Sequence, residues 1–379
     1  MISSTRLSRG SSWSGPPRGR PAPDQVLTDI ADYVCDYQIS STEAYRTARH
    51  CVMDALGCAL EALAYSACTR LLGPVVPGTV VPLGARVPGT SLELDPVTAT
   101  FNLGCLIRWL DFNDTFVAAE PGHPSDNLAA ILSVADWLSR KRIAAGRTPL
   151  AMRDVLTALI KAYEIQGCLS IENSFNGLGY DHMALLKTAS AAVVTQLLGG
   201  GREHIVNAVS NVWADGTPLK VYRQAPNTGS RKSWAAGDAT SRAVRLAMIS
   251  KTGEMGYPSV LTAKTWGFYD VYNDGRPFRF QRPYGTYIID NVHFKISYPA
   301  AFHAQTLAEA AIRLHPLVRT RLDDIAKIEI WTYGYAFGIL NKTGPLANFA
   351  DRDHCLQYVA AIGLIHGRLT AEDYEDHIA

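Results

Sequence analysis

The feature that most constrains the fold is a change in the spacing of apolar residues near residue 266. Before this point, several segments have the length and the apolar spacing of helices. The predicted helices span residues 126–140, 150–169, 182–198, 202–213 and 235–252. An earlier helix start is predicted at residues 40–43, because Ser followed three positions later by Glu is typical of a helix N-terminus.

After residue 266 the sequence favours strands as well as helices. Residues 278–297 are rich in Tyr, Phe, Ile and Val around prolines, and residues 324–332 alternate isoleucines with polar neighbours. Both patterns predict β-strands. Two further helices are predicted, at residues 303–314 and 351–365.

These patterns predict a mainly α protein with two domains. A chain of 379 residues exceeds what one hydrophobic core usually supports. We therefore expect a large helical domain over residues 25–266 and a smaller α+β domain over residues 267–379. No uninterrupted apolar run reaches about 18 residues, so no membrane-spanning helix is predicted.

The first 23 residues differ in composition from the rest. They contain 4 arginines, 6 serines and 4 prolines, and the first acidic residue is Asp24. This composition is typical of a mitochondrial transit peptide and lacks the apolar core of a secretory signal. Residues 1–24 are thus predicted to be a transit peptide to the mitochondrial matrix, with a disordered tail on a cytoplasmic protein as the alternative.

The net charge and the spacing of the cysteines limit the classes of molecule that the chain is expected to bind. With 36 Lys and Arg against 35 Asp and Glu, the net charge of +1 gives no signal for nucleic acid or an acidic membrane. An anionic ligand must then be held locally. The 7 cysteines are scattered without a C-x-x-C pair, which favours reduced core thiols, although a cluster held by three cysteines stays open on counting alone.

Residues 108–115 and 122–127 place ionisable side chains between two apolar segments. The segments on either side, residues 99–107 and 128–138, are strongly hydrophobic. The aspartates and the histidine are therefore carried toward an interior. Buried charges are unfavourable unless they are paired or used, so this region is a candidate site.

Four other places combine polar or basic residues with apolar or glycine-rich surroundings: residues 179–182, 220–223, 228–238 and 294–303. Each alone is a weak signal, because a single histidine at a helix start is more often a cap or a core residue. Taken together, the cations, aspartates and histidines suit a site that holds a polycarboxylate and moves protons on it.

Long strings resemble one family. RWLDFNDT, GHPSDN, ADWLSR, KAYEIQGC, RKSWAAGDATSRAVRLA, KTGEMGYPSVLTA, WGFYDV, FRFQRPYG and ADRDHC are similar to the MmgE/PrpD family, from about Gln25 to the last residue. The resemblance implies a large all-helical domain, a smaller α+β lid, an active site in the cleft between them, and a homodimer.

The resemblance also implies the reaction. The expected activity is that of a hydro-lyase that dehydrates 2-methylcitrate to 2-methylaconitate in the methylcitrate cycle of propionate catabolism, without an iron–sulfur cluster or another cofactor. Such a site needs a base, an acid for the departing hydroxyl, and cations for the growing negative charge. Decarboxylation of cis-aconitate and epimerisation of iminodisuccinate on the same scaffold are alternatives.

The family's motifs carry over residue by residue. The matching residues are Asp111 and Thr115 of D-x-x-x-T, His123 of H-P-S, His182 at a helix start, Lys232 of K-x-x-x-A-G and Lys295 of F-K-x-x-x-P.

The resemblance implies the following roles. We expect Asp111 and His123 to form a proton-transferring pair, and His182 to be the second acid/base partner. Lys232 and Lys295 complete the expected catalytic set and, with Arg231, are expected to clamp substrate carboxylates. The expected substrate-binding residues are Thr115, Arg231 and Tyr298. Which group removes the C–H proton stays open.

Two other uses of the same region remain as alternatives. Ser125 could be a nucleophile, but it lies almost beside His123 and lacks a nucleophile-elbow sequence. His123 and Asp126 could bind a metal, but no third ligand stands at a characteristic spacing.

Family members usually continue well beyond the region that matches Ala379. The resemblance therefore implies an incomplete lid, with unpaired sheet edges and exposed apolar surface. In that case an inactive product, or a non-catalytic dimerisation partner, is a third possibility.

Overall fold

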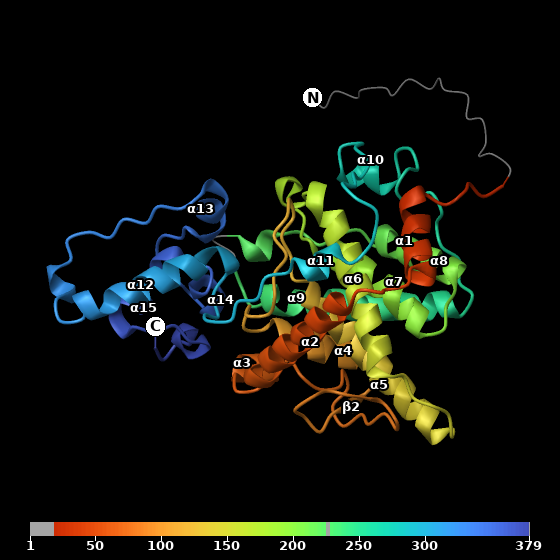
Figure 1. The fold of residues 1–379 in the computed structure, drawn as a ribbon, viewed down its shortest axis with the longest axis horizontal. Coiled ribbons are helices and arrows are strands. Elements are labelled where there is room, and N and C mark those ends of the chain that lie inside the picture. The colour runs from red at the N-terminus through yellow and green to blue at the C-terminus, as the bar shows by residue number, and fades with distance from the viewer. Residues whose placement is uncertain (1–18, 225–227, 379) are drawn as a thin grey trace, which may run out of the picture.

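The computed structural model describes residues 19–224 and 228–378 and consists mainly of helices (Figure 1). Most of the predicted transit peptide, residues 1–18, lies outside the described residues. The helices are α1 Gln25–Asp36, α2 Thr42–Ala62, α3 Ser66–Thr69, α4 Pro96–Arg108, α5 Leu128–Ala144, α6 Met152–Glu172, α7 Met183–Leu197, α8 Arg202–Ala214, α9 Arg231–Lys251, α10 Phe268–Tyr272, α11 Tyr287–Asp290, α12 Gln305–Val318, α13 Gly334–Leu340, α14 Phe349–Arg352 and α15 Leu356–His366.

Short 3₁₀ helices, a two-stranded ladder and isolated β-bridges make up the rest of the secondary structure of the described residues. The 3₁₀ helices are η1 Pro124–Asn127, η2 Asn176–Leu178, η3 Val221–Arg223, η4 Phe302–Ala304, η5 Leu322–Asp324 and η6 Ala371–Tyr374. Strands β1 Ala85–Arg86 and β2 Glu93–Leu94 pair antiparallel, with Ala85 opposite Leu94.

The helices predicted from apolar spacing are confirmed. Each of the segments predicted between residues 126 and 252 contains one long helix, and α12 and α15 cover most of the two later predictions. The predicted start near residue 40 is also correct: the Ser41 hydroxyl accepts a hydrogen bond from the Ala44 backbone N–H at 3.0 Å. This bond satisfies one of the unpaired donors at the start of α2.

The large domain, formed by α1 to α11, packs around α4, α7 and α9. Helices α4 and α9 approach each other at Gly104 and Gly237. A Cβ atom built on Gly104 would stand 2.4 Å from the Gly237 Cα atom, so the crossing requires glycine. This contact brings the C-terminal end of α4, and the polar segment that follows it, against the start of α9.

The strand predicted at residues 278–297 is wrong. This segment instead contains α11, and its apolar side chains, including Phe278 and Ile288, are buried in the core of the large domain. The buried Glu164 carboxylate accepts hydrogen bonds from the backbone of Gly285 at 2.8 Å and Ile288 at 2.9 Å. The segment therefore satisfies its polar backbone partly against a side chain of α6, and its backbone pairing with extended chain is a single antiparallel bridge, between His293 and Thr115.

The small domain, formed by η4 to η6, has α12 and α15 at its centre and lies to one side of the large domain (Figure 1). Residues 324–332 were predicted to be a strand, and this is also wrong: Asp324 ends η5, and residues 325–332 lie in no strand among the described residues. Alternation of apolar residues favours extended backbone, but a strand also requires a partner for its N–H and C=O groups.

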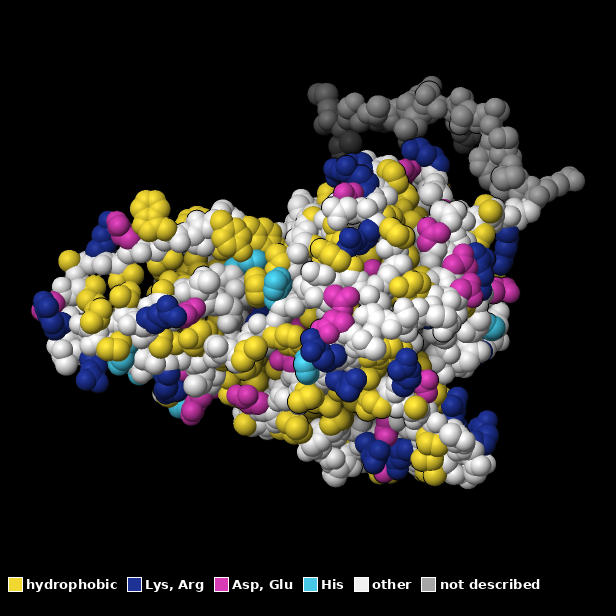
Figure 2. All heavy atoms as spheres, viewed as in Figure 1, with side chains coloured by type: hydrophobic (Ala, Val, Ile, Leu, Met, Phe, Trp, Pro, Cys, Tyr) yellow, Lys and Arg dark blue, Asp and Glu magenta, His cyan; other side chains and the backbone are white. Residues whose placement is uncertain are grey.

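Apolar side chains remain exposed on the small domain (Figure 2). Trp331 is 91% exposed, and Phe337 of α13 is 58% exposed.

A mainly α architecture with a second, smaller domain is thus the observed fold class. The boundary predicted near residue 266 stays a prediction. Among the described residues, no helix combines the length and the apolar character that crossing a membrane would require.

Candidate active site

A cavity of about 90 Å³ lies between the two domains and collects many of the polar residues singled out in the sequence. Its lining residues are Arg108, Asp111, Thr115, Pro121, Gly122, His123, His182, Lys220, Arg223, Gln224, Ala301, Phe302, His303, Tyr335, Ile339, Leu340 and His354. A wider hollow of about 680 Å³ adjoins it and shares Lys220 and Tyr335 with it. The cavity is therefore walled by both domains and continues toward the wider hollow.

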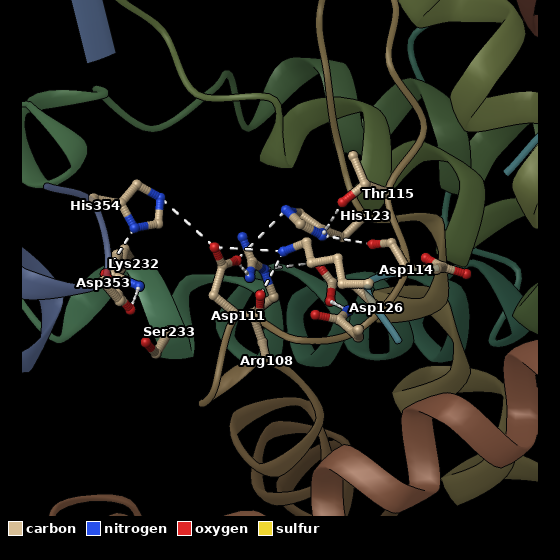
Figure 3. Close-up of polar contacts among 12 residues, drawn as sticks. Arg108, Asp111, Asp114, Thr115, His123, Asp126, Lys232, Ser233, Asp353 and His354 are labelled. Atoms are coloured by element: carbon tan, nitrogen blue, oxygen red, sulfur yellow. Dashed lines mark hydrogen bonds and ion pairs between the residues drawn. The ribbon is translucent and has the colours of Figure 1, made fainter. Parts of the chain in front are cut away.

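Asp111 lies at the centre of the polar wall (Figure 3). It follows the last turn of α4 and has a φ angle of 50°. This left-handed conformation is uncommon outside glycine, but Asp adopts it more readily than most residues. The turn places the Asp111 carboxylate beside the Arg108 guanidinium, with which it forms a buried ion pair.

Several other nitrogen atoms surround the Asp111 carboxylate. The His123 Nε2 atom is 3.6 Å from Oδ1, the Lys295 Nζ atom is 3.6 Å from Oδ2, and the His354 Nε2 atom is 3.7 Å from Oδ2. Burial lowers the pKa of Arg108 to about 10, so this group is still protonated at neutral pH. The carboxylate is thus paired with the Arg108 cation and faces two imidazoles, while burial and the nearby Arg108 hold the pKa of Lys295 well below its usual value.

The His123 ring has a defined tautomer. Its Nδ1 atom is 2.7 Å from the Asp114 carbonyl oxygen, which can only accept, so Nδ1 carries the proton. The Thr115 hydroxyl is 3.3 Å from the same nitrogen atom. Burial and the nearby Arg108 hold the His123 pKa well below its usual value. His123 is therefore neutral, with an unprotonated Nε2 atom on the Asp111 side.

His182 is held from behind by a second carboxylate. Its Nδ1 atom is 3.2 Å from Asp181 Oδ1, and Asp181 is also paired with the Arg223 guanidinium. The His182 Nε2 atom is buried and has no hydrogen-bond partner among the described residues. Burial lowers the His182 pKa to about 3, while the Asp181 charge opposes that shift. A ligand in the cavity would find this nitrogen atom available.

Three cations line the cavity: Arg108, Lys220 and Arg223. The Lys220 Nζ atom is 3.5 Å from Glu120 Oε1. The Arg223 Nη2 atom is buried and has no partner among the described residues. A buried N–H group of this kind calls for an acceptor, and a carboxylate suits a guanidinium best.

Two of the predicted lysines lie behind the wall rather than on it. The buried Lys232 Nζ atom is 2.6 Å from Asp353 Oδ2, so it binds a carboxylate of the small domain. The buried Lys295 ammonium donates to the Asp111 carbonyl oxygen. Both therefore contact groups that border the cavity.

Arg231 and Tyr298 lie elsewhere. The Arg231 guanidinium is 3.2 Å from Asp238 and stacks on Trp234 at 4.3 Å, beside a separate surface hollow. Tyr298 packs on the core of the small domain, and its carbonyl oxygen accepts a hydrogen bond from Gln305 at 2.9 Å. The structure brings Asp111, Thr115, His123 and His182 to one cavity, but not these two.

The polar residues next to His123 form a buried support. Asp114 accepts hydrogen bonds from the Ser125 hydroxyl at 2.7 Å and the Tyr163 hydroxyl at 2.5 Å. Asp126 lies 3.6 Å from Arg108. Within residues 19–224 and 228–378, no three His, Cys, Asp or Glu side chains gather as ligands of one metal ion would.

The sequence reasoning missed several cavity residues. Arg108 and His354 lie within the family motifs RWLDFNDT and ADRDHC, but no role was predicted for them. Lys220 and Arg223 begin and end the candidate segment 220–223, for which no role was predicted either. The available signal was therefore the motif, but neither spacing nor composition shows which of its members reach the cavity.

Comparison with known proteins identifies the family. The sequence matches the MmgE/PrpD N-terminal domain over residues 28–281 and the MmgE/PrpD C-terminal domain over residues 298–379. It is 65% identical to the 2-methylcitrate dehydratase of Cupriavidus necator, a match that covers 96% of this chain and 76% of the relative. It is 62% identical to that of Escherichia coli K12, over 95% and 75%. It is 58% identical to a mitochondrial 2-methylcitrate dehydratase of Yarrowia lipolytica, over 95% and 70%. The chain belongs to the MmgE/PrpD family.

Proposed function

We propose that this chain is a hydro-lyase that dehydrates 2-methylcitrate to 2-methylaconitate in the methylcitrate cycle of propionate catabolism. The relatives described above are named 2-methylcitrate dehydratase. The observation that carries the chemistry is the buried Asp111 carboxylate, with the unprotonated His123 Nε2 atom 3.6 Å away on the cavity wall. The proposed mechanism uses side chains alone.

The cavity cations suit a substrate with three carboxylates. We assign Arg108, Lys220 and Arg223 to carboxylate binding, because all three line the cavity. Thr115 also lines it and is proposed to contact the substrate. Lys232 and Lys295 act in this proposal as positioning residues, through the carboxylate and carbonyl groups that they hold.

We assign the two proton transfers of the dehydration to His123 and His182. Dehydration breaks a C–H bond beside a carboxylate and the C–O bond of the hydroxyl, forms C=C, and releases water. His123 suits the base, because its Nε2 atom is unprotonated and Asp111 can stabilise the imidazolium that forms. His182 suits the acid that protonates the leaving hydroxyl: its ring is neutral before substrate binds, and the Asp181 carboxylate together with the carboxylates of a bound substrate favours uptake of a proton on its buried Nε2 atom.

We further propose a homodimer in the mitochondrial matrix, with the cytoplasm as the alternative location. The arginine-rich, acid-free first 23 residues support the mitochondrial location, as does the name of the Yarrowia lipolytica relative. Sedimentation and fractionation of the expressed chain test these two statements.

The direct test offers 2-methylcitrate, cis-aconitate and iminodisuccinate separately to the purified chain and identifies each product by NMR. We expect 2-methylaconitate from 2-methylcitrate, with unchanged turnover after dialysis against a chelator. Release of carbon dioxide from cis-aconitate, or epimerised iminodisuccinate, as the main reaction would contradict the proposal. Absence of all three reactions would favour a non-catalytic protein.

A further inference from the structure

The cavity also contains an imidazole from the small domain, with a carboxylate behind it. His354 follows α14 and lines the cavity opposite the polar wall of the large domain. Its Nδ1 atom is 2.7 Å from Asp353 Oδ1 (Figure 3). Its side chain is 15% exposed, and that of Asp353 is 2% exposed. This is the arrangement of an oriented imidazole rather than of a surface histidine.

The carboxylate behind His354 is itself fixed by the large domain. The second oxygen atom of Asp353 is 2.6 Å from the Lys232 Nζ atom of α9. Lys232 is 1% exposed, so this ion pair is shielded from solvent. The contacts thus run from Lys232 to Asp353, to His354, and back to Asp111 of the large domain.

The geometry defines the protonation of His354. An ionised carboxylate can only accept, so the Nδ1 atom that faces Asp353 carries the proton. Burial, with the nearby Lys232 charge, lowers the His354 pKa to about 3. The imidazole is then neutral, and its unprotonated Nε2 atom is turned toward Asp111.

Asp111 therefore faces two unprotonated imidazole nitrogen atoms, one on each oxygen. His123 Nε2 is 3.6 Å from Oδ1 and His354 Nε2 is 3.7 Å from Oδ2. A proton that arrives on either ring gives an N–H group that can bond to the carboxylate. The Asp111 carboxyl group can pass that proton to the other ring once it has turned its protonated oxygen atom toward that ring.

We propose that His354 is a further acid/base residue of this site, and that Asp353 and Lys232 are its positioning residues. The proposal rests on the dehydration proposed above. The proton that His123 takes from the C–H bond passes through Asp111 to His354, so His123 is neutral again. His182, which takes up a proton on Nε2 when the substrate binds, gives that proton to the leaving hydroxyl, forming water. Loss of a proton by His354 to solvent then restores the starting state.

The test compares His354→Gln with His366→Gln. His366 is an exposed histidine of the same domain and serves as the matched control. We expect His354→Gln to lower kcat by about 10²–10⁴-fold, the usual contribution of a general acid or base, with KM little changed. The control should keep wild-type values. Wild-type kcat in a folded His354→Gln chain would overturn the proposal.

A second readout separates chemistry from structure. Added imidazole should restore part of the turnover of His354→Ala, because a free ring can occupy the vacated space. Asp353→Asn should leave the ring in place but change its tautomer, which ¹⁵N NMR of the imidazoles reports. Failure of both rescue and tautomer change would show that His354 is only a packing residue.

The proposed dehydration and the proposed place of His354 in the site can be refuted independently of each other. A wild-type chain that leaves 2-methylcitrate unchanged refutes the dehydration. The place of His354 is then decided with tricarballylate, a tricarboxylate without a hydroxyl group, as the probe. We expect its binding to shift the His354 Nε2 resonance in wild type. Binding without any such shift would overturn the placement of His354 in the site.

Discussion

The buried ion pair between Lys232 and Asp353 gives the sharpest prediction of stability. Both side chains are almost fully buried, at 1% and 2% exposure, and their charged atoms are 2.6 Å apart. Lys232→Met keeps the apolar stem but leaves the Asp353 carboxylate without its cation. Removing one partner of a buried pair typically lowers the free energy of unfolding by about 3–5 kcal/mol.

The measurement is urea unfolding of the wild type, Lys232→Met, Asp353→Leu and the double variant, followed by circular dichroism. The double variant should be more stable than the sum of the single losses predicts, with an interaction energy of about 2–3 kcal/mol, because it leaves no unpaired charge. An apolar pair can replace a buried ion pair with little loss.

The pH dependence of the stability loss in Lys232→Met tests whether the unpaired Asp353 charge causes it. Lys232 and the neighbouring His354 lower the Asp353 pKa below its usual value, so this carboxylate stabilises the folded chain above its unfolded pKa. That stability is lost as the pH falls through the folded pKa. The difference between wild type and Lys232→Met should therefore shrink in acid. A loss under about 1 kcal/mol at pH 7, or additive single losses, would refute the reasoning and favour a Lys232 that binds substrate directly.

Three further predictions concern packing, pH and the cavity cations. Gly104→Ala should lower the free energy of unfolding by about 1–3 kcal/mol, because its Cβ atom would stand 2.4 Å from Gly237; Gly57→Ala, with no atom within 4 Å, is the control and should not destabilise. Between pH 7 and 5 the wild type should lose about 2 kcal/mol more stability than His354→Gln in urea titrations, because the His354 pKa is about 3 in the folded chain and its ordinary value is 6.5. At pH 5 only the unfolded state binds this proton, whereas buried carboxyl groups with raised pKa values, such as Asp126 at about 6, act on both chains alike. Equal losses in the two chains would contradict the neutral burial of His354. Arg223→Lys should raise KM for 2-methylcitrate more than it lowers kcat, and an unchanged KM would place that guanidinium outside the binding site.

The long helices could be predicted because each has an apolar face that its own sequence records. The two predicted strands were wrong, because strand formation also depends on residues outside the segment itself. Residues 325–332 have the alternation of a strand, but pairing depends on a neighbour far away in sequence, and none is present among the described residues. Residues 278–297 show the same limit, since Glu164 of α6 accepts two of their backbone hydrogen bonds and their pairing with Thr115 is an isolated bridge at His293.

Only the part of the site that is close in sequence was predicted correctly. Asp111, Thr115 and His123 lie close in sequence, in two neighbouring motifs, and the fold brings all three to the same wall. The motif did not show that Lys232 reaches a carboxylate of the small domain, because that contact exists only after the two domains pack. Roles that depend on tertiary neighbours, such as that of His354, were outside the reach of the sequence.

The most direct test of the account is the rate at which His123→Ala and wild type convert 2-methylcitrate to 2-methylaconitate, followed through the absorbance of the new double bond. We predict turnover by the wild type and a loss of about 10²–10⁴-fold in the variant, with its circular dichroism spectrum unchanged. Near wild-type turnover by a folded His123→Ala chain would contradict acid/base dehydration at this cavity.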